Sequence, residues 1–251
     1  MIAPVFGQIQ KWKLRWQRHG LFGSLKQAYL VVCQFFKFKG SPSYIIERLR
    51  VRREGREFDR RYGTDTGGKV HAANLGITGP NILFADGYLA TAPRSFIDTI
   101  GRLPIIHRDF VFIDYGSGKG RALLMAAEFP FKTIIGIEIS QILHEIAQQN
   151  IERLSSQPKQ CKNIISLNLD VETFVPPQDP LLCYFYNPFR AKVMENVLGT
   201  LKNSIDHNSR DIWIMYNNAL HAHLLDTATW LAPFDSIDCF RIWRSVVAVK
   251  Q

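Results

Sequence analysis

The chain has 251 residues, 46% of them hydrophobic, which suffices for one α/β domain with an extension and a sizeable core. No uncharged apolar run reaches about 18 residues, so the sequence predicts no transmembrane helix. Lys11, Lys13 and Arg15 interrupt the N-terminal segment, which therefore lacks the pattern of a secretory signal. The cysteines have no close sequence partner and indicate buried, reduced thiols in a cytoplasmic protein: Cys33, Cys161, Cys183 and Cys239.

The positive charge of the chain is concentrated near its N-terminus. Residues 1–61 carry 14 Lys/Arg and 4 Asp/Glu, a net charge of +10, whereas the remainder carries 17 and 18, a net charge of −1. A basic extension of this kind is typical of an arm for an anionic partner, which could be nucleic acid, an acidic protein or a lipid headgroup surface. A solvated helical face explains the same charges, and the sequence does not decide between the two interpretations.

The first part of the chain predicts helices followed by loops. Residues 8–39 fit one or two amphipathic helices that would lie on an anionic membrane surface, dock a partner or cap the domain. Gly40-Ser41-Pro42 indicates a hinge, after which residues 44–62 predict a strongly basic helix. We therefore expect three parts: a basic helical extension at 1–62, a loop-rich linker and lid segment at 63–109, and the core at 110–251.

The core predicts a regular alternation of strands and helices. Helices are expected at 95–102, 141–154, 191–201 and 219–228, the second with Ser140 as its N-cap. Strands are expected at 110–113, 133–137, 164–169, 181–186, 211–216, 234–240 and 242–249. Unbroken apolar strands that alternate with helices indicate a mostly parallel, doubly wound sheet covered on both faces. The last two strands are close enough in sequence to form an antiparallel hairpin.

A glycine loop follows the first core strand and begins at Asp114. A phosphate loop does not fit, because Ile113 stands where its first glycine should be and Gly120 follows Lys119 in place of Ser or Thr. A dinucleotide fingerprint does not fit either, because Arg121 occupies its last glycine position. The pattern D-x-G-x-G-x-G is met in full, by Asp114, Gly116, Gly118 and Gly120.

Polar residues end four consecutive predicted strands. They are Asp114, Glu138, Asp170 and Asn187. In a doubly wound sheet these strand ends line one crevice, and an acid after the second strand can accept hydrogen bonds from a ribose diol. The loop and these acids together predict a nucleoside-binding site.

This combination of loop and acids resembles the class I (Rossmann-like) S-adenosylmethionine (AdoMet) methyltransferases. The resemblance covers about residues 88–250 and implies a seven-stranded sheet with a C-terminal antiparallel hairpin, AdoMet as cofactor and methyl transfer as the reaction. It implies that the loop from Asp114 contacts the methionine part of AdoMet, that Glu138 accepts both ribose hydroxyls, and that Asp170 and Val171 meet the adenine. The remaining cofactor-binding residues expected around these are Tyr115, Gly116, Ser117, Gly118, Gly120 and Ile139.

Tyr88 and Thr91 lie just before the first core strand. In the methyltransferases that this chain resembles, such a segment often closes over the methionine end of AdoMet, so both residues are candidate cofactor contacts. A packing aromatic and an N-terminal turn residue are the favoured explanation of the same positions.

The fourth strand leads into Asn187-Pro188-Phe189, the candidate catalytic residues. The triplet is similar to part of the Asn/Asp-Pro-Pro-aromatic motif of amine-directed methyltransferases, and its shortened form also resembles the loop of the Dot1-like histone-lysine enzymes. The resemblance implies that the Asn187 and Pro188 carbonyls orient a target amine by hydrogen bonds. Alternatively, Pro188 only stiffens a turn before the next helix.

The sequence predicts no metal site and no hydrolase. His221 and His223 lack the spacing of a zinc protease, and neither a G-x-S-x-G elbow nor a Cys–His set is present. Lys119 and Arg121 are expected to face solvent or the ligand carboxylate.

The motifs together predict an AdoMet-dependent methyltransferase whose acceptor is a protein, a nucleic acid or a small molecule, with a protein lysine or a small-molecule amine as the favoured target. Alternatives are another AdoMet-derived group transfer and an inactive AdoMet-binding scaffold with a basic arm for nucleic acid or membrane.

Overall fold

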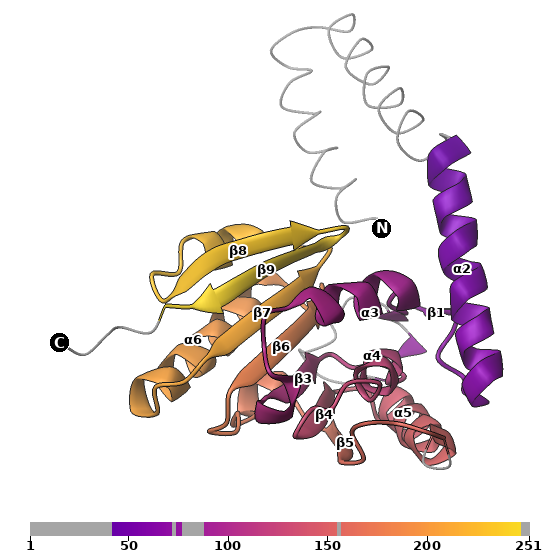
Figure 1. Ribbon diagram of the computed structural model, residues 1–251, viewed down its shortest axis with the longest axis horizontal. Helices are drawn as coiled ribbons and strands as arrows, with labels where there is room; N and C mark the ends of the chain where they lie inside the picture. The colour runs from indigo at the N-terminus through magenta and orange to yellow at the C-terminus, as the bar shows by residue number, and fades with distance from the viewer. Residues whose placement is uncertain (1–41, 72–73, 77–87, 155–156, 247–251) are drawn as a thin grey trace, which may run out of the picture. The chain divides into compact units, whose positions relative to one another are not determined.

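The structure, a computed structural model, describes residues 42–71, 74–76, 88–154 and 157–246 (Figure 1). The chain divides into two units, residues 1–52 and residues 53–251. The basic helix expected at 44–62 is confirmed as α2 (Pro42–Tyr62), which begins in the first unit and ends in the second. The predictions for residues 8–39, the start of the hinge at Gly40-Ser41 and the environment of Cys33 lie outside the described residues.

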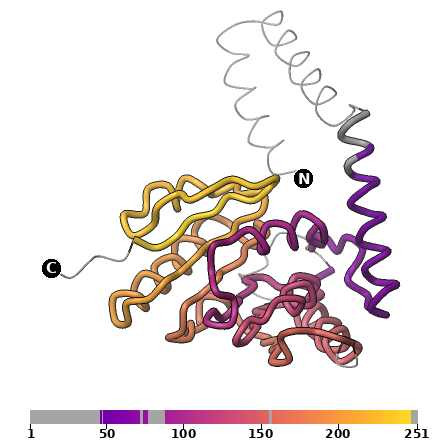
Figure 2. Tube along the Cα trace, in the orientation of Figure 1, coloured from indigo at the N-terminus to yellow at the C-terminus, as the bar shows by residue number. Residues whose placement is uncertain are grey.

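The second unit is built on a seven-stranded sheet, and this confirms the predicted fold class. Its strand order is β5-β4-β3-β6-β7-β9-β8. The first five strands in this order are parallel, whereas β9 runs antiparallel to both β7 and β8. The strands are β3 (Val111–Tyr115), β4 (Thr133–Glu138), β5 (Ile164–Asn168), β6 (Leu181–Tyr186), β7 (Ile212–Asn217), β8 (Leu231–Ile237) and β9 (Phe240–Ser245). Figure 2 shows the C-terminal hairpin, β8 and β9, in yellow.

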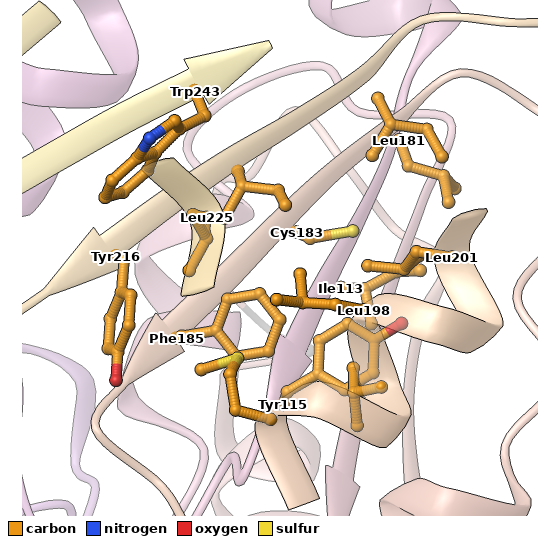
Figure 3. Close-up of a cluster of buried hydrophobic side chains, with 14 of the residues drawn as sticks. Ile113, Tyr115, Leu181, Cys183, Phe185, Leu198, Leu201, Tyr216, Leu225 and Trp243 are labelled. Atoms are coloured by element: carbon orange, nitrogen blue, oxygen red, sulfur yellow. The ribbon is translucent and has the colours of Figure 1, made fainter. Parts of the chain in front are cut away.

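Helices cover both faces of this sheet. Successive side chains of each central strand point to opposite faces, so apolar side chains on both faces need to be buried. On one face, Ile113 and Tyr115 of β3 pack with α6 (Ala191–His207) and α7 (Ala222–Asp226) in the cluster that Figure 3 shows. On the other face, Phe112 packs among apolar side chains of several helices. These are the end of α2, α3 (Pro93–Arg102), α4 (Arg121–Ala126) and α5 (Gln141–Leu154).

The order of the strands determines where a ligand can bind. From β3 the chain proceeds to β4 and β5 on one side of the sheet, and β6 and β7 lie on the other side. The carboxyl end of β3 is therefore a topological switch point, where helices leave the sheet in opposite directions and open a crevice. A separate two-stranded antiparallel pair, β1 (Lys69–Val70) and β2 (Tyr88–Leu89), comes from the linker segment.

Several predicted boundaries differ from those of the structure. Helix α6 extends to His207, because its apolar face continues through Leu201 and Ile205, which are buried. The final hairpin turns at Asp238, whose φ of +52° places it in the left-handed region that short polar side chains tolerate. Phe240 therefore begins β9, and the expectation that it ends the preceding strand is wrong. Asp114 lies inside β3, one residue before the strand ends.

Candidate functional site

A pocket of about 970 Å³, which includes the space open to solvent at its mouth, lies at the carboxyl end of β3. It collects residues from the glycine loop, from the ends of β4 and β6, from the 3₁₀ turn after β5 and from the linker segment. Most of the predicted site residues line it: Tyr88, Thr91, Asp114, Gly116, Ser117, Gly118, Glu138, Ile139, Asp170, Val171, Asn187, Pro188 and Phe189. Two predicted cofactor contacts, Tyr115 and Gly120, do not line it.

The glycine loop follows a path that side chains would block. Gly116 and Gly118 have φ values of +83° and +55°, which glycine adopts readily and other L-residues do not. A Cβ atom on Gly116 would lie 2.5 Å from Cβ of Pro188, and one on Gly118 would lie 2.3 Å from the Tyr88 ring. The loop backbone is thus packed between the catalytic candidate Pro188 and the linker residue Tyr88.

Tyr88 is positioned by the linker segment. Its hydroxyl donates a hydrogen bond of 2.7 Å to the carbonyl of Thr66. Burial, the largest cause, raises the pKa of the Tyr88 hydroxyl, so it stays protonated and remains a donor at neutral pH. Thr91 is buried and its hydroxyl lies 2.8 Å from the hydroxyl of Tyr184. Both linker candidates therefore line the pocket. Tyr88 packs against Gly118 of the glycine loop, and Thr91 contacts Tyr184 of β6.

Glu138 is held rigidly at the end of β4. Its Oε2 accepts a hydrogen bond of 2.7 Å from the Gly118 N–H, and its Oε1 accepts one of 2.8 Å from the Ser140 N–H. Burial raises the pKa of this carboxyl, and the backbone N–H groups oppose the increase. Because each carboxylate oxygen has a second lone pair, Glu138 can accept further hydrogen bonds from a ligand diol.

Asp114 is buried beside Glu138. Burial raises the pKa of the Asp114 carboxyl well above its usual range, and repulsion from Glu138 adds to the increase. Two buried acids in one pocket favour a cationic ligand group, because a positive charge would offset both the lost hydration and the mutual repulsion.

Ser117 supplies a buried polar atom without a partner in the described part of the chain. Its Oγ has no hydrogen-bond partner there, although the residue lines the pocket. An unsatisfied buried hydroxyl costs free energy, of the order of 1–3 kcal/mol. A ligand group in the pocket would remove this cost, so the loop fits a polar ligand.

Asp170 and Val171 form the side of the pocket that follows β5. Asp170 is the N-cap of the 3₁₀ turn Val171–Thr173, where its Oδ1 accepts a 3.0 Å hydrogen bond from the Glu172 N–H. This capping bond fixes the orientation of the carboxylate. Val171 offers an apolar surface next to it.

The triplet Asn187-Pro188-Phe189 lies between β6 and α6. Asn187 has a φ of +42°, a left-handed conformation that is costly for a residue with a side chain and is often found at functional sites. Its Oδ1 accepts a 3.3 Å hydrogen bond from the Tyr216 hydroxyl. Phe189 is buried and packs edge-on against Phe185, at a centroid distance of 6.1 Å. The triplet is therefore both a rigid turn and a wall of the pocket.

Tyr115 and Gly120 have structural positions. The Tyr115 ring stacks on Phe185 at 4.8 Å inside the core cluster of Figure 3. Gly120 is the N-cap of α4 with a φ of +84°, and a Cβ atom there would lie 3.2 Å from Cβ of Ala147. Tyr115 therefore holds the strand, and Gly120 lets α4 approach α5.

Lys119 and Arg121 do not face solvent, which corrects one of the two expectations for them. Lys119 is buried, and its Nζ lies 3.1 Å from Asp65 Oδ1. Arg121 is buried, and its Nη2 lies 3.2 Å from Asp59 Oδ2. Arg121 also lines the pocket, whereas Lys119 does not. Arg121 was expected near the ligand carboxylate as one of two options, but it was not among the predicted site residues. A place near the ligand carboxylate stays a prediction.

Other pocket residues were also missed. Tyr184, Tyr186, Leu143, Leu75 and Glu172 line the pocket. Their sequence positions resemble ordinary core or loop positions, so no local pattern identifies them.

Within the described ranges no group of three or more His, Cys, Asp or Glu side chains could hold a metal ion. Within the same ranges no helix is long and apolar enough to span a membrane.

Comparison with known proteins agrees with the predicted enzyme class. Residues 108–186 match a protein family described as "Putative methyltransferase", and this segment contains the glycine loop, Glu138 and Asp170. The match supports the prediction of a class I methyltransferase for the part of the chain that forms β3 to β6. A search of curated proteins gave no match.

Solved structures with related folds are methyltransferases of several kinds. An RNA methyltransferase from Salinibacter ruber in complex with S-adenosyl-L-homocysteine (AdoHcy) aligns with a TM-score of 0.44 at 17% identity, over 65% of this chain and 96% of that one. A dimethyladenosine transferase from Plasmodium falciparum aligns with a TM-score of 0.46 at 14% identity, over 63% of each chain. A magnesium protoporphyrin IX methyltransferase from Synechocystis PCC 6803 aligns with a TM-score of 0.42 at 14% identity, over 61% and 76%. At these scores the likenesses carry no argument about substrate, and the narrower resemblance to Dot1-like enzymes is not confirmed.

Proposed function

We propose that the protein is an AdoMet-dependent methyltransferase that acts on an amine nitrogen. One observation carries the proposal: a single pocket is lined by the glycine loop, by Glu138, by Asp170 and by Asn187-Pro188-Phe189. The match of residues 108–186 to a family described as "Putative methyltransferase" supports the methyl transfer, and the choice of an amine rests on the Asn187-Pro188-Phe189 triplet.

The charges that line the pocket suit AdoMet. Its described lining contains four carboxyl groups and one guanidinium: Asp114, Glu138, Asp170, Glu172 and Arg121. AdoMet carries a sulfonium, an ammonium and a carboxylate, so it has a net positive charge and one anionic group. An acidic pocket with a single cation therefore complements both the overall charge and the zwitterionic end of this ligand.

Each end of the cofactor has matching partners in the pocket. We assign the ribose hydroxyls to Glu138, because its oxygens are fixed by the Gly118 and Ser140 N–H groups and retain lone pairs. We assign the adenine to Asp170 and Val171, which offer a hydrogen-bond acceptor beside an apolar surface. The unsatisfied Ser117 Oγ and the acid Asp114 lie at the loop, where the methionine part would be held.

The chemistry that AdoMet supplies is a methyl group activated by the sulfonium charge. The chain would contribute mainly positioning. Asn187 Oδ1 and the Pro188 carbonyl would accept hydrogen bonds from the target amine and direct its lone pair into the pocket. The Tyr216 hydroxyl already donates to Asn187 Oδ1, which fixes the orientation of the amide before the acceptor binds.

Calorimetric titration with AdoHcy tests the cofactor assignment. We expect wild-type protein to bind AdoHcy, and Glu138→Ala to weaken this binding by about tenfold or more, because a charged hydrogen-bond acceptor for the ribose is lost. Absence of binding at millimolar AdoHcy would refute the proposal as a whole.

Labelled AdoMet tests the acceptor. The protein is incubated with AdoMet labelled in its methyl group and with separated protein, RNA and small-molecule fractions of a lysate. We expect label on an amine of one fraction and a much lower rate with Asn187→Ala, whose AdoHcy affinity should be unchanged. Wild-type rates with Asn187→Ala would remove the amine-positioning role.

A further inference from the structure

We propose that Arg121 binds the α-carboxylate of AdoMet, and that Asp59 and Thr66 are positioning residues that hold its guanidinium in place. This inference rests on the proposed function, because it assigns the remaining charged group of the same cofactor. It also connects the end of α2 and the linker segment to the cofactor site.

Arg121 occupies an unusual position for an arginine. It is the first residue of α4, directly behind the glycine loop, and its side chain is only 5% exposed. A buried guanidinium needs both a counter-charge and hydrogen-bond acceptors, since removal from water is costly. Asp59 supplies the counter-charge, and the position of Arg121 at the wall of a pocket makes it a candidate contact for a ligand.

The guanidinium is held by residues far upstream in the sequence. Its Nε donates a 2.7 Å hydrogen bond to Thr66 Oγ1, and its Nη2 donates to Asp59 Oδ2 at 3.2 Å. Longer bonds run from Nη2 to the Gly55 carbonyl at 3.5 Å and from Nη1 to the Thr91 carbonyl at 3.4 Å. These contacts come from α2, from the linker and from the residue before the N-cap of α3, so they fix the plane of the guanidinium.

One donor of this guanidinium has no partner among the described residues. A guanidinium has five N–H groups. The four hydrogen bonds use the Nε group, both groups of Nη2 and one group of Nη1. The second N–H of Nη1 remains, on the same nitrogen that contacts Thr91, a residue that lines the pocket.

Charge explains why this donor suits a carboxylate. Arg121 is the single cationic side chain among the described residues that line the pocket, and the other charged residues in the lining are all acids. Among the charged side chains of the described lining, the acids can pair with the ammonium of the cofactor, above all Asp114, whereas only Arg121 can pair with its carboxylate. A misplaced carboxylate would face Asp114 or Glu138 and be repelled.

Asp59 and Thr66 do not line the pocket, so they act on the ligand through the residues that they hold. Asp59 Oδ1 also accepts bonds from the Thr64 hydroxyl at 2.9 Å and from the Thr66 N–H at 3.0 Å, so one carboxylate organises both the linker and the guanidinium. The Thr66 carbonyl in turn accepts a hydrogen bond from the Tyr88 hydroxyl. We call this set of residues, Asp59, Thr64, Thr66, Tyr88 and Arg121, the methionine clamp.

Two ligands that differ only in the carboxylate provide the test. AdoHcy carries the amino-acid carboxylate, and decarboxylated AdoHcy keeps the adenosine, the sulfur and the amine. Binding of each to the full chain is measured by calorimetry. We expect wild-type protein to bind AdoHcy about 10- to 100-fold more tightly than the decarboxylated form, the range of a hydrogen bond between charged groups.

The Arg121→Gln variant should remove this difference. Its AdoHcy affinity should fall about 10- to 100-fold, whereas its affinity for decarboxylated AdoHcy should change less than about twofold. Binding of the decarboxylated ligand also shows that the variant is folded. If Arg121→Gln does not fold, Thr66→Val is the second variant: it removes the acceptor of Nε, together with the hydrogen bond from the Thr66 hydroxyl to Asp59 Oδ1. It should lower AdoHcy affinity selectively by about two- to tenfold.

Lys119→Met is the matched control. Lys119 is a buried cation on the same loop and binds the same linker through Asp65, but it does not line the pocket. Any effect of this variant should be equal for the two ligands. Equal losses for both ligands in Arg121→Gln, or equal wild-type affinities, would overturn the assignment while leaving the cofactor proposal intact. If wild-type protein binds neither ligand, the proposed function itself fails.

Discussion

Two glycines of this chain differ sharply in what surrounds them. Gly118 has a positive φ, and a Cβ atom there would lie 2.3 Å from the Tyr88 ring, whereas nothing lies within 4 Å of a Cβ atom at Gly199 in α6. We expect Gly118→Ala to reduce the free energy of unfolding by about 1–3 kcal/mol and to weaken AdoHcy binding at least about tenfold, because the strained loop must move. Urea unfolding and calorimetry measure both effects.

Gly199→Ala is the control for that substitution. It adds the same methyl group to the interior of a helix, where alanine is favoured, and should stabilise the protein by about 0.5–1 kcal/mol without changing affinity. A tolerated Gly118→Ala would show that the loop does not need its observed path.

Asp114 should make stability depend on pH. Its folded-state pKa is raised, chiefly by burial and then by repulsion from Glu138, so protonation favours the folded state. The stabilisation is present below the ordinary pKa of an aspartate, near 3.9, and is lost as pH rises through the raised value. Relative to wild type, ligand-free Asp114→Asn should therefore become more stable as pH rises, by about 1.4 kcal/mol for each unit of raised pKa.

Unfolding in urea between about pH 4 and pH 8 measures this difference. Comparison of the two proteins at each pH cancels the contributions of the other titrating groups, apart from the coupled Glu138. A constant difference over the range would mean that Asp114 titrates normally in the folded state.

At the scale of elements, the sequence predicts the framework of the site but not its clamp. Strand β6 matches its expected bounds, and Glu138 and Asn187 lie where their strands end or just beyond, because apolar runs and their polar ends are local signals. The methionine clamp depends on Asp59 and Thr66 meeting Arg121 across more than 50 residues. Nothing in local composition or periodicity encodes such a pairing.

Boundaries were least predictable where packing overrides local pattern. The helix expected at 219–228 is confined to Ala222–Asp226, and Tyr115 was assigned to the ligand although its ring faces the core. Side chains of one strand alternate between faces, so a residue next to a motif can point away from the site. A shift of one position thus separates a site residue from a core residue.

The end of α2 is part of the folded core of the second unit. Phe58 is 7% exposed and packs among the residues that cover one face of the sheet, and the Arg121 guanidinium carbon lies 5.8 Å from its ring centroid. Phe58→Ala should cost about 3–5 kcal/mol of unfolding free energy, since a large buried side chain is lost. Leu49→Ala, at a position of the same helix that is 58% exposed, should change it by less than about 0.5 kcal/mol.

Chemical denaturation of both variants measures these values. Similar, small effects of the two substitutions would mean that this helix contributes little to the stability of the domain.

At the scale of the whole molecule, the excess positive charge and the cofactor site belong to different parts of the sequence. The chain has a net charge of +9, yet the lining of the pocket is mainly acidic, because the excess of basic residues belongs to the N-terminal part. An anionic partner for this part stays a prediction. The pocket should select against anionic nucleotides, since four carboxyl groups would repel their phosphates.

Thermal unfolding with added ligands tests this selectivity. AdoHcy at 100 times its Kd should stabilise the folded state by about 2.7 kcal/mol, which raises the Tm by about 5–10 °C for a domain of this size. ATP at the same concentration should leave the Tm unchanged. Stabilisation by ATP equal to that by AdoHcy would show that the site recognises adenine alone.

The long sequence separation between the linker and the residues that hold it has a consequence for biosynthesis. The backbone N–H of Asp65 donates to Asn150 Oδ1, and Asn150 Nδ2 in turn donates to the Asp65 carbonyl, so the linker is fastened to a residue 85 positions later. During translation at about 5–20 residues per second, this segment leaves the ribosome about 4–17 s before its partner. The basic helix and linker therefore spend that interval without their docking site, available to chaperones, and the cofactor site is completed only when the second half of the domain has emerged.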